Sequence, residues 1–277
     1  MLPVNGLMAG KRGLVMGVAN DHSIAWGIAQ ALAAAGARLA FTYQGDTFER
    51  RVRPLAQQLG VDHVLPCDVE DEASLDRIFA ELGRAWGRLD FVVHAIAFSD
   101  KEELKGRYLD TTRANFKRTL LISCYSLTEV ARRAQPLMHD GGALLTLSYI
   151  GAARVTPSYN VMGVAKAALE CSVRYLAADL GSQNIRVNCI SAGPVRTLAG
   201  SAIADARFTY GWTRDQSPLR RPVALEEVGR AGLYLLSDLS SGVTGEVHFV
   251  DCGYHVVGIP SPRGLTQGEV TKTKEAT

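Results

Sequence analysis

The chain has 277 residues, of which 47% are hydrophobic and 21% are charged, and its formal net charge at pH 7 is +2. This length suits one large α/β domain, the composition is typical of a globular protein, and so small a net charge gives no reason to expect a nucleic-acid partner. No apolar run reaches the roughly 18 residues of a membrane span. Residues 1–10 also lack the charged start and apolar core of a secretion signal. We therefore expect a cytoplasmic protein without a transmembrane segment.

Cysteine and histidine positions support that expectation. The five cysteines are widely spaced and form no paired motif, which is typical of reduced thiols. The six histidines have no ligand-type spacing, so we predict no metal site.

Strand and helix patterns alternate along the whole chain. In chain order we expect a strand at 12–18, a helix at 23–35, a strand at 37–43, a helix at 47–59, a strand at 61–66, a helix at 73–86, a strand at 89–95, a helix at 111–134, a strand at 142–148, a helix at 157–180, a strand at 185–190, a helix at 225–236 and a strand at 246–250. This alternation predicts an α/β doubly wound (Rossmann) fold in one domain, with a seven-stranded parallel sheet and helices on both faces. Residues 1–258 would form the dinucleotide-binding catalytic domain and 259–277 a mobile tail.

The first strand leads into a turn that suits a dinucleotide. Gly17 permits a tight turn, Ser23 can cap the following helix, and free amides at that helix start can face a pyrophosphate. Gly27 lies one turn into the helix and allows close packing against a strand. The stretch is not the G-x-G-x-x-G fingerprint, so an ordinary strand–helix turn remains an alternative.

The ends of the next three strands offer further cofactor contacts. The second strand ends at Gln44, with an acid nearby and no basic residue before Arg50, which favours NADH over NADPH. The arginines at 50, 51 and 53 could equally form a solvated helix face. Asp68 and Val69 follow the third strand, where they could read the adenine edge. Residues 94–97 end the fourth strand and would run beneath the two riboses.

Two tyrosines and a lysine follow the fifth strand. Thr156 and Pro157 are typical of a helix start, and on that helix Tyr159 and Lys166 would be separated by about 700°, so both would emerge from one face. A nearby cation favours charge on a phenol, and the phenol can give a proton to an oxygen that becomes negative. A buried tyrosine with an unrelated solvated lysine is the alternative.

Residues 191–221 form the one long stretch without clear periodicity. A connection of this length inside a compact domain is usually a lid or a binding loop.

Together these residues resemble the short-chain dehydrogenase/reductase superfamily and, within it, the enoyl-acyl carrier protein reductases of bacterial type II fatty acid synthesis. The resemblance covers residues 7–258. Its marks are the 17–27 turn, six residues between Tyr159 and Lys166 where most of the superfamily has three, and Tyr149 at a position usually held by serine. Residues 160–163 and 193–199 also fit the family. Ala97 and Ser99 depart from it near the acyl pocket, which bears on chain length and inhibitor response rather than on reaction type.

The resemblance implies that NADH delivers hydride to the β-carbon of a trans-2-enoyl thioester, the last step of each elongation cycle. A donor aimed at the resulting enolate oxygen lowers the barrier. The implied catalytic residues are Tyr159 as that donor, Lys166 on the nicotinamide ribose, and Tyr149 beside the acyl chain.

The other implied site residues fall into two sets. The expected cofactor-binding residues are Gly17, Ser23, Ile24, Gln44, Asp68, Val69, Ile96, Lys166, Val195, Arg196, Thr197, Leu198 and Ala199. The expected substrate-binding residues are Ser99, Tyr149, Tyr159, Ile203 and Phe208, although ordinary helix packing explains the last two equally well.

The partner expected from the resemblance is acyl carrier protein, which is acidic and would be steered by a basic rim. Candidate rim residues are Arg207, Arg214, Arg220 and Arg221, with a solvated surface as the alternative. The family analogy also implies a homotetramer, in which residues 165–169, Tyr175 and Leu176 could pack against a partner helix.

Two other functions stay open. A related superfamily enzyme would reduce a ketone or oxidise an alcohol, and the Tyr159–Lys166 spacing together with Tyr149 disfavours it. A non-catalytic NAD-binding regulator is disfavoured because both Tyr159 and Lys166 are present.

Overall fold

The computed structural model describes residues 6–195, 197 and 206–259. Within them a seven-stranded sheet has the order β3-β2-β1-β4-β5-β6-β7, and every neighbouring pair is parallel. The strands are β1 (Arg12–Met16), β2 (Arg38–Tyr43), β3 (His63–Pro66), β4 (Phe91–His94), β5 (Gly142–Ser148), β6 (Ile185–Ala192) and β7 (Val247–Val250). The predicted doubly wound fold is confirmed. The strand order reverses between β1 and β4, and such a switch point is where open parallel sheets bind ligands, at the carboxyl ends of the strands.

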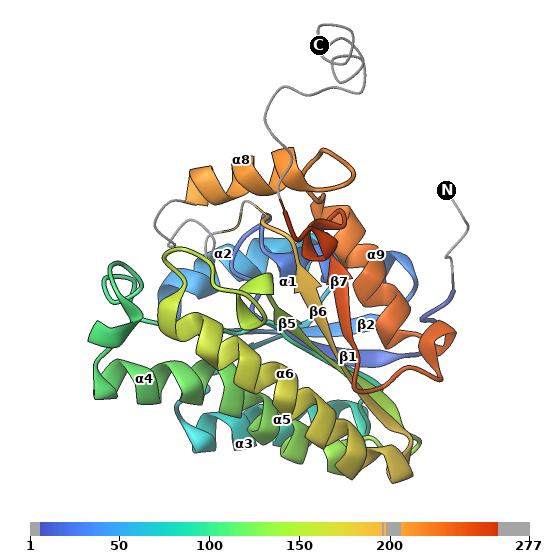
Figure 1. Ribbon diagram of the computed structural model, residues 1–277. Coiled ribbons are helices and arrows are strands. Elements are labelled where there is room, and N and C mark those ends of the chain that lie inside the picture. Colours follow the sequence, from blue (N-terminus) through green and yellow to red (C-terminus); the bar gives the residue numbers. More distant parts are fainter. Residues whose placement is uncertain (1–5, 196, 198–205, 260–277) are drawn as a thin grey trace, which may run out of the picture.

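Helices cover both faces of the sheet (Figure 1). They are α1 (Ile24–Ala34), α2 (Gly45–Gln58), α3 (Glu72–Trp86), α4 (Arg113–Leu120), α5 (Ser126–Ala134), α6 (Asn160–Leu180), α8 (Ala206–Gln216) and α9 (Leu225–Leu236). Buried side chains of α1, α2 and α9 form one core layer, and those of α3, α5 and α6 form the other. Figure 1 shows α8 at the top of the view, above the sheet.

Glycines let α1 and α9 cross closely. A Cβ on Gly229 would lie 2.4 Å from the carbonyl oxygen of Gly27, and one on Gly232 would lie 2.9 Å from Ile28. A Cβ on Gly27 would strike Leu225 at 2.7 Å. The predicted close packing at Gly27 is therefore confirmed, but its partner is a helix and not a strand.

The predicted helix at 111–134 is interrupted. After α4 the chain forms a π-helical segment, η2 (Leu121–Tyr125), before α5 begins. Ser126 Oγ donates to the carbonyl oxygen of Ile122 at 2.6 Å, and Ser123 Oγ bonds both backbone groups of Phe98. Buried hydroxyls that bind backbone groups compete with regular helix bonding, and π-bulges often mark functional sites.

The predicted helix start at Thr156–Pro157 is wrong. Ser158 and Asn160 adopt φ angles of 57° and 38°, so a turn precedes α6, which begins at Asn160. The Asn160 side-chain amide donates to the carbonyl oxygens of Leu104 and Gly106 at 3.0 and 3.3 Å, and these bonds hold the turn in place. The long stretch at 191–221 also differs from the expected loop, because it contains α8.

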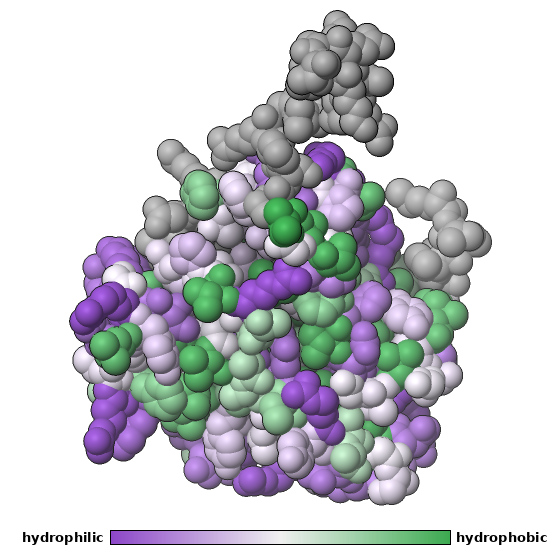
Figure 2. Space-filling model, in the orientation of Figure 1, coloured by the Kyte–Doolittle hydropathy of each residue, from purple (hydrophilic) through white to green (hydrophobic). Residues whose placement is uncertain are grey.

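The described residues contain no helix that is both long and apolar enough to cross a membrane. The five cysteines are free thiols, as predicted. On the face shown in Figure 2, apolar and hydrophilic residues are interspersed.

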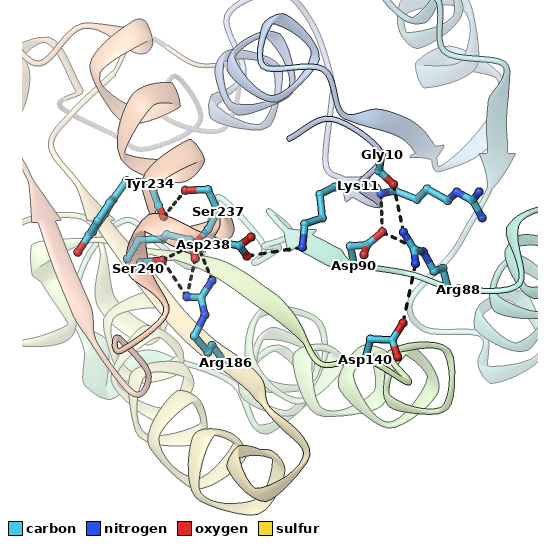
Figure 3. A network of polar contacts seen from close by, with 12 residues as sticks. Gly10, Lys11, Arg88, Asp90, Asp140, Arg186, Tyr234, Ser237, Asp238 and Ser240 are labelled. Carbon is cyan, nitrogen blue, oxygen red and sulfur yellow. Dashed lines mark hydrogen bonds and ion pairs between the residues drawn. The ribbon is translucent and has the colours of Figure 1, made fainter. Parts of the chain in front are cut away.

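Arg186 forms hydrogen bonds with carbonyl groups at the end of α9 (Figure 3). Its guanidinium donates to the carbonyl oxygens of Leu235 at 2.8 Å and Ser237 at 3.1 Å, and to Ser240 Oγ at 2.9 Å. A helix end leaves carbonyls that need such donors.

Arg186→Met is expected to lower the free energy of unfolding by about 2–4 kcal/mol, because several buried acceptors lose their donor at once. Urea unfolding measures this change. The control is Lys11→Met, which removes an ion pair of 3.5 Å with Asp238 in the same region. Lys11 is 34% and Asp238 80% exposed, so solvent screens this pair and the control should cost less than about 1 kcal/mol. Equal costs for the two variants would contradict the assigned role of Arg186.

Candidate active site

The candidate residues converge at the carboxyl edge of the sheet. β1, β4, β5 and β6 lead directly into Gly17, Ala95, Tyr149 and Gly193. Register pairs Met16 with His94, His94 with Thr146, and Ser148 with Ser191, so these four exits stand side by side. The sequence elements assigned to cofactor and to chemistry thus share one edge.

Gly17 makes the tight turn that was predicted. Its φ is +97°, and a Cβ there would lie 2.0 Å from the carbonyl oxygen of Ala95. The backbone of the β1–α1 turn therefore passes directly over the end of β4. This close approach leaves a cradle that only glycine permits.

Ser23 takes the predicted N-cap position of α1, but its side chain makes no capping hydrogen bond. The hydroxyl donates to the carbonyl oxygen of Asn20 at 2.7 Å and accepts from the Ala19 amide at 3.4 Å, so it shapes the turn instead. The first turn of α1, which starts at Ile24, contains no acidic residue. An anion at this helix start would meet no competing carboxylate.

Gln44 lies just before α2 and next to Tyr43, which contacts the ion pair of Arg53 and Glu49. Arg53 Nε donates to Glu49 Oε1 at 2.7 Å, and its guanidinium lies 5.8 Å from the centre of the Tyr43 ring. Arg53 is thus already paired with Glu49. The arginines at 50, 51 and 53 are all exposed, in agreement with the alternative of a solvated helix face.

Asp68 and Val69 form the turn after β3. Asp68 Oδ1 accepts from the Glu70 amide at 2.9 Å, while the Asp68 amide donates to Ser74 Oγ at 3.0 Å. Val69 is buried and contributes to the core, and Ile96 packs partly against the same cluster. These bonds fix the backbone of the turn.

A clamp that sequence reasoning missed joins this turn to α4. Arg118 donates from Nε and Nη2 to the two carboxylate oxygens of Glu70 at 2.9 and 2.7 Å. Its guanidinium also lies 4.4 Å from the centre of the Phe98 ring. Charge signs alone could not identify the pair, because its members are 48 positions apart in the chain.

Ser99 directs its hydroxyl toward α4. It accepts from Thr119 Oγ1 at 2.9 Å and from Asn115 Nδ2 at 3.2 Å, while Asn115 Oδ1 accepts from the Asp100 amide at 3.0 Å. The network holds the loop after β4 in place. Asn115 and Thr119 are buried polar residues on α4 that the sequence analysis did not single out.

The two tyrosines contact each other directly. The ring centres of Tyr149 and Tyr159 lie 5.1 Å apart with an interplanar angle of 69°, an edge-to-face arrangement. Burial raises the pKa of Tyr149 to about 12. Tyr159 is only 6% exposed, and burial raises the pKa of its phenol well above the ordinary value.

The net shift of the Tyr159 pKa is upward, opposite to the shift that a nearby cation alone would give, because loss of solvation dominates. The protonated phenol is a hydrogen-bond donor at neutral pH.

Lys166 is buried, which excludes the alternative of a solvated lysine. Its Nζ donates to the carbonyl oxygen of Leu147 at 2.8 Å, two residues before Tyr149. Burial lowers the pKa of Lys166 to about 8.

His94 is a second buried group at this edge. Its Nε2 lies 2.8 Å from Ser126 Oγ and its Nδ1 lies 3.1 Å from Thr146 Oγ1. Burial lowers the pKa of His94 to about 3, so the imidazole is neutral at physiological pH. Sequence reasoning placed His94 near the riboses but did not anticipate these two hydroxyl partners.

A cavity of about 190 Å³ lies between the turn that joins β1 to α1 and helix α8. Its lining residues are His22, Val195, Tyr210, Val223 and Leu225. The backbone turns sharply after β6, where the Thr197 amide donates to the carbonyl oxygen of Val195 at 2.8 Å. The predicted residues Arg196, Leu198, Ala199 and Ile203 lie outside the described residues.

Phe208 is 57% exposed on α8, where it stacks on Trp212 with ring centres 6.0 Å apart. Three of the four candidate rim arginines bind neighbouring acceptors, and the side chain of Arg207 lies outside the described part of the chain. Arg214 lies 2.7 Å from Asp215, Arg221 lies 2.7 Å from Glu227, and Arg220 donates to the carbonyl oxygen of Asp215.

Comparison with known proteins adds an independent observation. A family described as "Enoyl-(Acyl carrier protein) reductase" matches residues 17–255. "Enoyl-[acyl-carrier-protein] reductase [NADH] 2" of Rhizobium meliloti is 64% identical over 262 residues, covering 95% of this chain and 98% of the relative.

Two solved structures match almost the whole fold. The enoyl-(acyl-carrier-protein) reductase of Anaplasma phagocytophilum, in complex with NAD, has a TM-score of 0.90 and 60% identity and covers 93% of this chain and 98% of its own. The Bacillus cereus enoyl-acyl carrier protein reductase, with NADP+ and indole naphthyridinone, has a TM-score of 0.90 and 50% identity. It covers 91% of this chain and 99% of its own.

Proposed function

The chain belongs to the enoyl-(acyl carrier protein) reductase family, and from that premise we propose that it reduces the trans-2 double bond of enoyl thioesters carried by acyl carrier protein, using NADH. The observation that carries the proposal is the group formed by Tyr149, Tyr159 and Lys166 at the end of β5, beside the turn at Gly17. This reduction is the last step of each cycle of fatty acid elongation.

The residues at the sheet edge fit a dinucleotide. The glycine cradle at Gly17 and the start of α1 suit a pyrophosphate, for which backbone amides and the helix dipole are favourable. Gln44, Asp68, Val69 and Ile96 would hold the adenosine half. The segment from Val195 to Ala199 would hold the nicotinamide half. When bound, NADH supplies the hydride that is added to the β-carbon of the substrate.

Tyr159 donates a hydrogen bond to the thioester oxygen as negative charge develops on it. Its raised pKa keeps the proton on the phenol, so the group acts as a donor throughout the neutral pH range. A donor held in a buried site stabilises developing charge more strongly than one in water. Tyr149 packs against the Tyr159 ring and lies beside the acyl chain, with Ser99, Ile203 and Phe208 as further substrate contacts.

Lys166 binds the ribose hydroxyls of the nicotinamide half. Lys166→Met keeps the aliphatic volume but removes the ammonium, and it is expected to raise the dissociation constant of NADH about tenfold or more, as for loss of one charged hydrogen-bond donor. Calorimetry measures this change, with the exposed Lys117→Met as a control that should bind NADH normally. An unchanged dissociation constant in Lys166→Met would remove Lys166 from the cofactor site.

NADH is the cofactor named for the Rhizobium meliloti relative, although the Bacillus cereus relative was solved with NADP+. We propose that this chain prefers NADH, since Gln44 carries no charge and Arg53 is paired with Glu49. The extra phosphate of NADPH would find the Arg53 guanidinium already engaged.

We also propose a cytoplasmic homotetramer. The family analogy supports the assembly, together with the exposed side chain of Tyr175 on α6. Ala165 and Leu169, which were expected on the same surface, are instead buried within the subunit. Acyl carrier protein presents the substrate, and residues 1–258 suffice as the catalytic unit, since the family match ends at residue 255.

One assay tests the proposed function. Oxidation of NADH is followed by absorbance with a trans-2-enoyl thioester, and then with an acetoacetyl thioester and with NADPH. We expect fast oxidation with the enoyl thioester and NADH only. Reduction of the acetoacetyl thioester instead would favour a ketone reductase, and cofactor binding without any turnover would favour a regulatory protein.

A further inference from the structure

Glu170 is a half-buried carboxylate that the mechanism above does not use. It lies on α6 one helical turn after Lys166, so the two side chains share a helix face. Burial raises the pKa of Glu170, against the opposing influence of the Ser148 hydrogen bond and of the charges of Arg174 and Lys166. Nothing in the sequence pattern distinguishes it from the other acids of the chain.

The contacts of Glu170 point to the end of β5. Ser148 Oγ donates to Glu170 Oε1 at 2.5 Å. Lys166 Nζ donates to the carbonyl oxygen of Leu147 at 2.8 Å. Two side chains of α6, one turn apart, therefore hold two consecutive residues of β5. The next residue is Tyr149, whose ring packs on Tyr159.

The charges around Lys166 come from several elements. Cys189 on β6 and Cys124 on η2 face it, but burial raises the pKa of both thiols and keeps them neutral. His94 on β4 is neutral as well. Of the groups that face Lys166 in the described part of the chain, Glu170 is the carboxylate.

We propose that Glu170 is a positioning residue: bound to Ser148, it fixes the end of β5 that carries Tyr149, and its negative charge holds the proton on Lys166. This inference rests on the proposed function, because it assigns Glu170 to the same site. Glu170 acts through Tyr149 and Lys166 and touches neither substrate nor cofactor.

Two variants separate the two effects. Glu170→Gln keeps an acceptor for Ser148 but removes the charge, whereas Ser148→Ala removes the hydrogen bond but keeps the charge. The matched control is Asp179→Asn, which removes an exposed carboxylate from the same helix. The dissociation constant of NADH is measured against pH for each protein, without any enoyl substrate, together with the pH profile of kcat and the KM of the enoyl thioester.

The wild-type protein should lose affinity for NADH as Lys166 deprotonates, with a midpoint that is absent in Lys166→Met. Glu170→Gln should move that midpoint about half a pH unit or more toward lower pH, because the ammonium loses a nearby anion. The alkaline limb of kcat should move with it. Ser148→Ala should leave the midpoint in place and raise the KM of the enoyl thioester about threefold, as expected when a substrate contact is positioned less firmly.

Superimposable pH profiles for Glu170→Gln, Asp179→Asn and the wild type would overturn the proposal for Lys166, and an unchanged KM in Ser148→Ala would overturn it for Tyr149. Should Glu170→Gln fail to fold, Glu170→Ala replaces it. That variant also removes the charge and must show the same shift of the midpoint toward lower pH. A wild-type protein that reduces no enoyl thioester would refute the proposed function, while the NADH titration would still test Glu170.

Discussion

Tyr159→Phe is expected to lower kcat for enoyl thioester reduction about 100-fold, the usual cost of losing one preorganised donor to developing negative charge. The phenylalanine ring can keep the edge-to-face packing on Tyr149, so the fold and the NADH dissociation constant should change little. Steady-state kinetics and calorimetry on the same preparation measure both quantities.

The matched control is Tyr149→Phe, which removes the neighbouring hydroxyl from the same pair of rings. We expect a smaller loss that appears mainly in KM, since Tyr149 is assigned to the acyl chain. Near-normal turnover in Tyr159→Phe would remove Tyr159 from its role. A larger loss in Tyr149→Phe would exchange the roles of the two tyrosines.

Gly17→Ala should disrupt both the fold and the cofactor site. The added Cβ would lie 2.0 Å from the carbonyl oxygen of Ala95, so the ends of β1 and β4 would have to separate. The positive φ adds about 1–2 kcal/mol of strain. We expect a loss of about 3 kcal/mol or more in the free energy of unfolding, which is the range of buried steric clashes. Binding of NADH should also become undetectable.

Gly45→Ala is the control for this substitution. Gly45 also has a positive φ, of 72°, but a Cβ there would meet nothing within 4 Å. It should therefore cost only the strain of about 1–2 kcal/mol and leave NADH binding intact. Urea unfolding and an NADH titration compare the two variants, and equal results would show that the β1–β4 contact is unimportant.

The fold could be predicted from the sequence because its signals are local. Alternating strand and helix periods were sufficient for the seven parallel strands and for most element positions. The errors arose where side chains far apart in the chain bind backbone groups. Ser123, for example, reaches Phe98 from a segment that periodicity assigned to one continuous helix, and Asn160 reaches Leu104 and Gly106 across the start of α6.

The position of the candidate site could also be predicted from the sequence, but the burial of its side chains could not. Strand ends meet at one edge of a parallel sheet, so Gly17, Tyr149 and Lys166 could be assigned to a common region before their contacts were known. Burial was not predictable from spacing, and burial decides the proton affinities. For that reason the sequence analysis did not anticipate that burial raises the pKa of the Tyr159 phenol, and it missed the half-buried Glu170.

The fate of the hydride tests the central claim most directly. The enzyme would be incubated with a trans-2-enoyl thioester and with NADH that carries deuterium at the carbon that donates hydride, and the product would be analysed by mass spectrometry and NMR. The account predicts a saturated acyl thioester with deuterium on the β-carbon. An unchanged enoyl thioester, or a saturated acyl thioester without deuterium on the β-carbon, would contradict it.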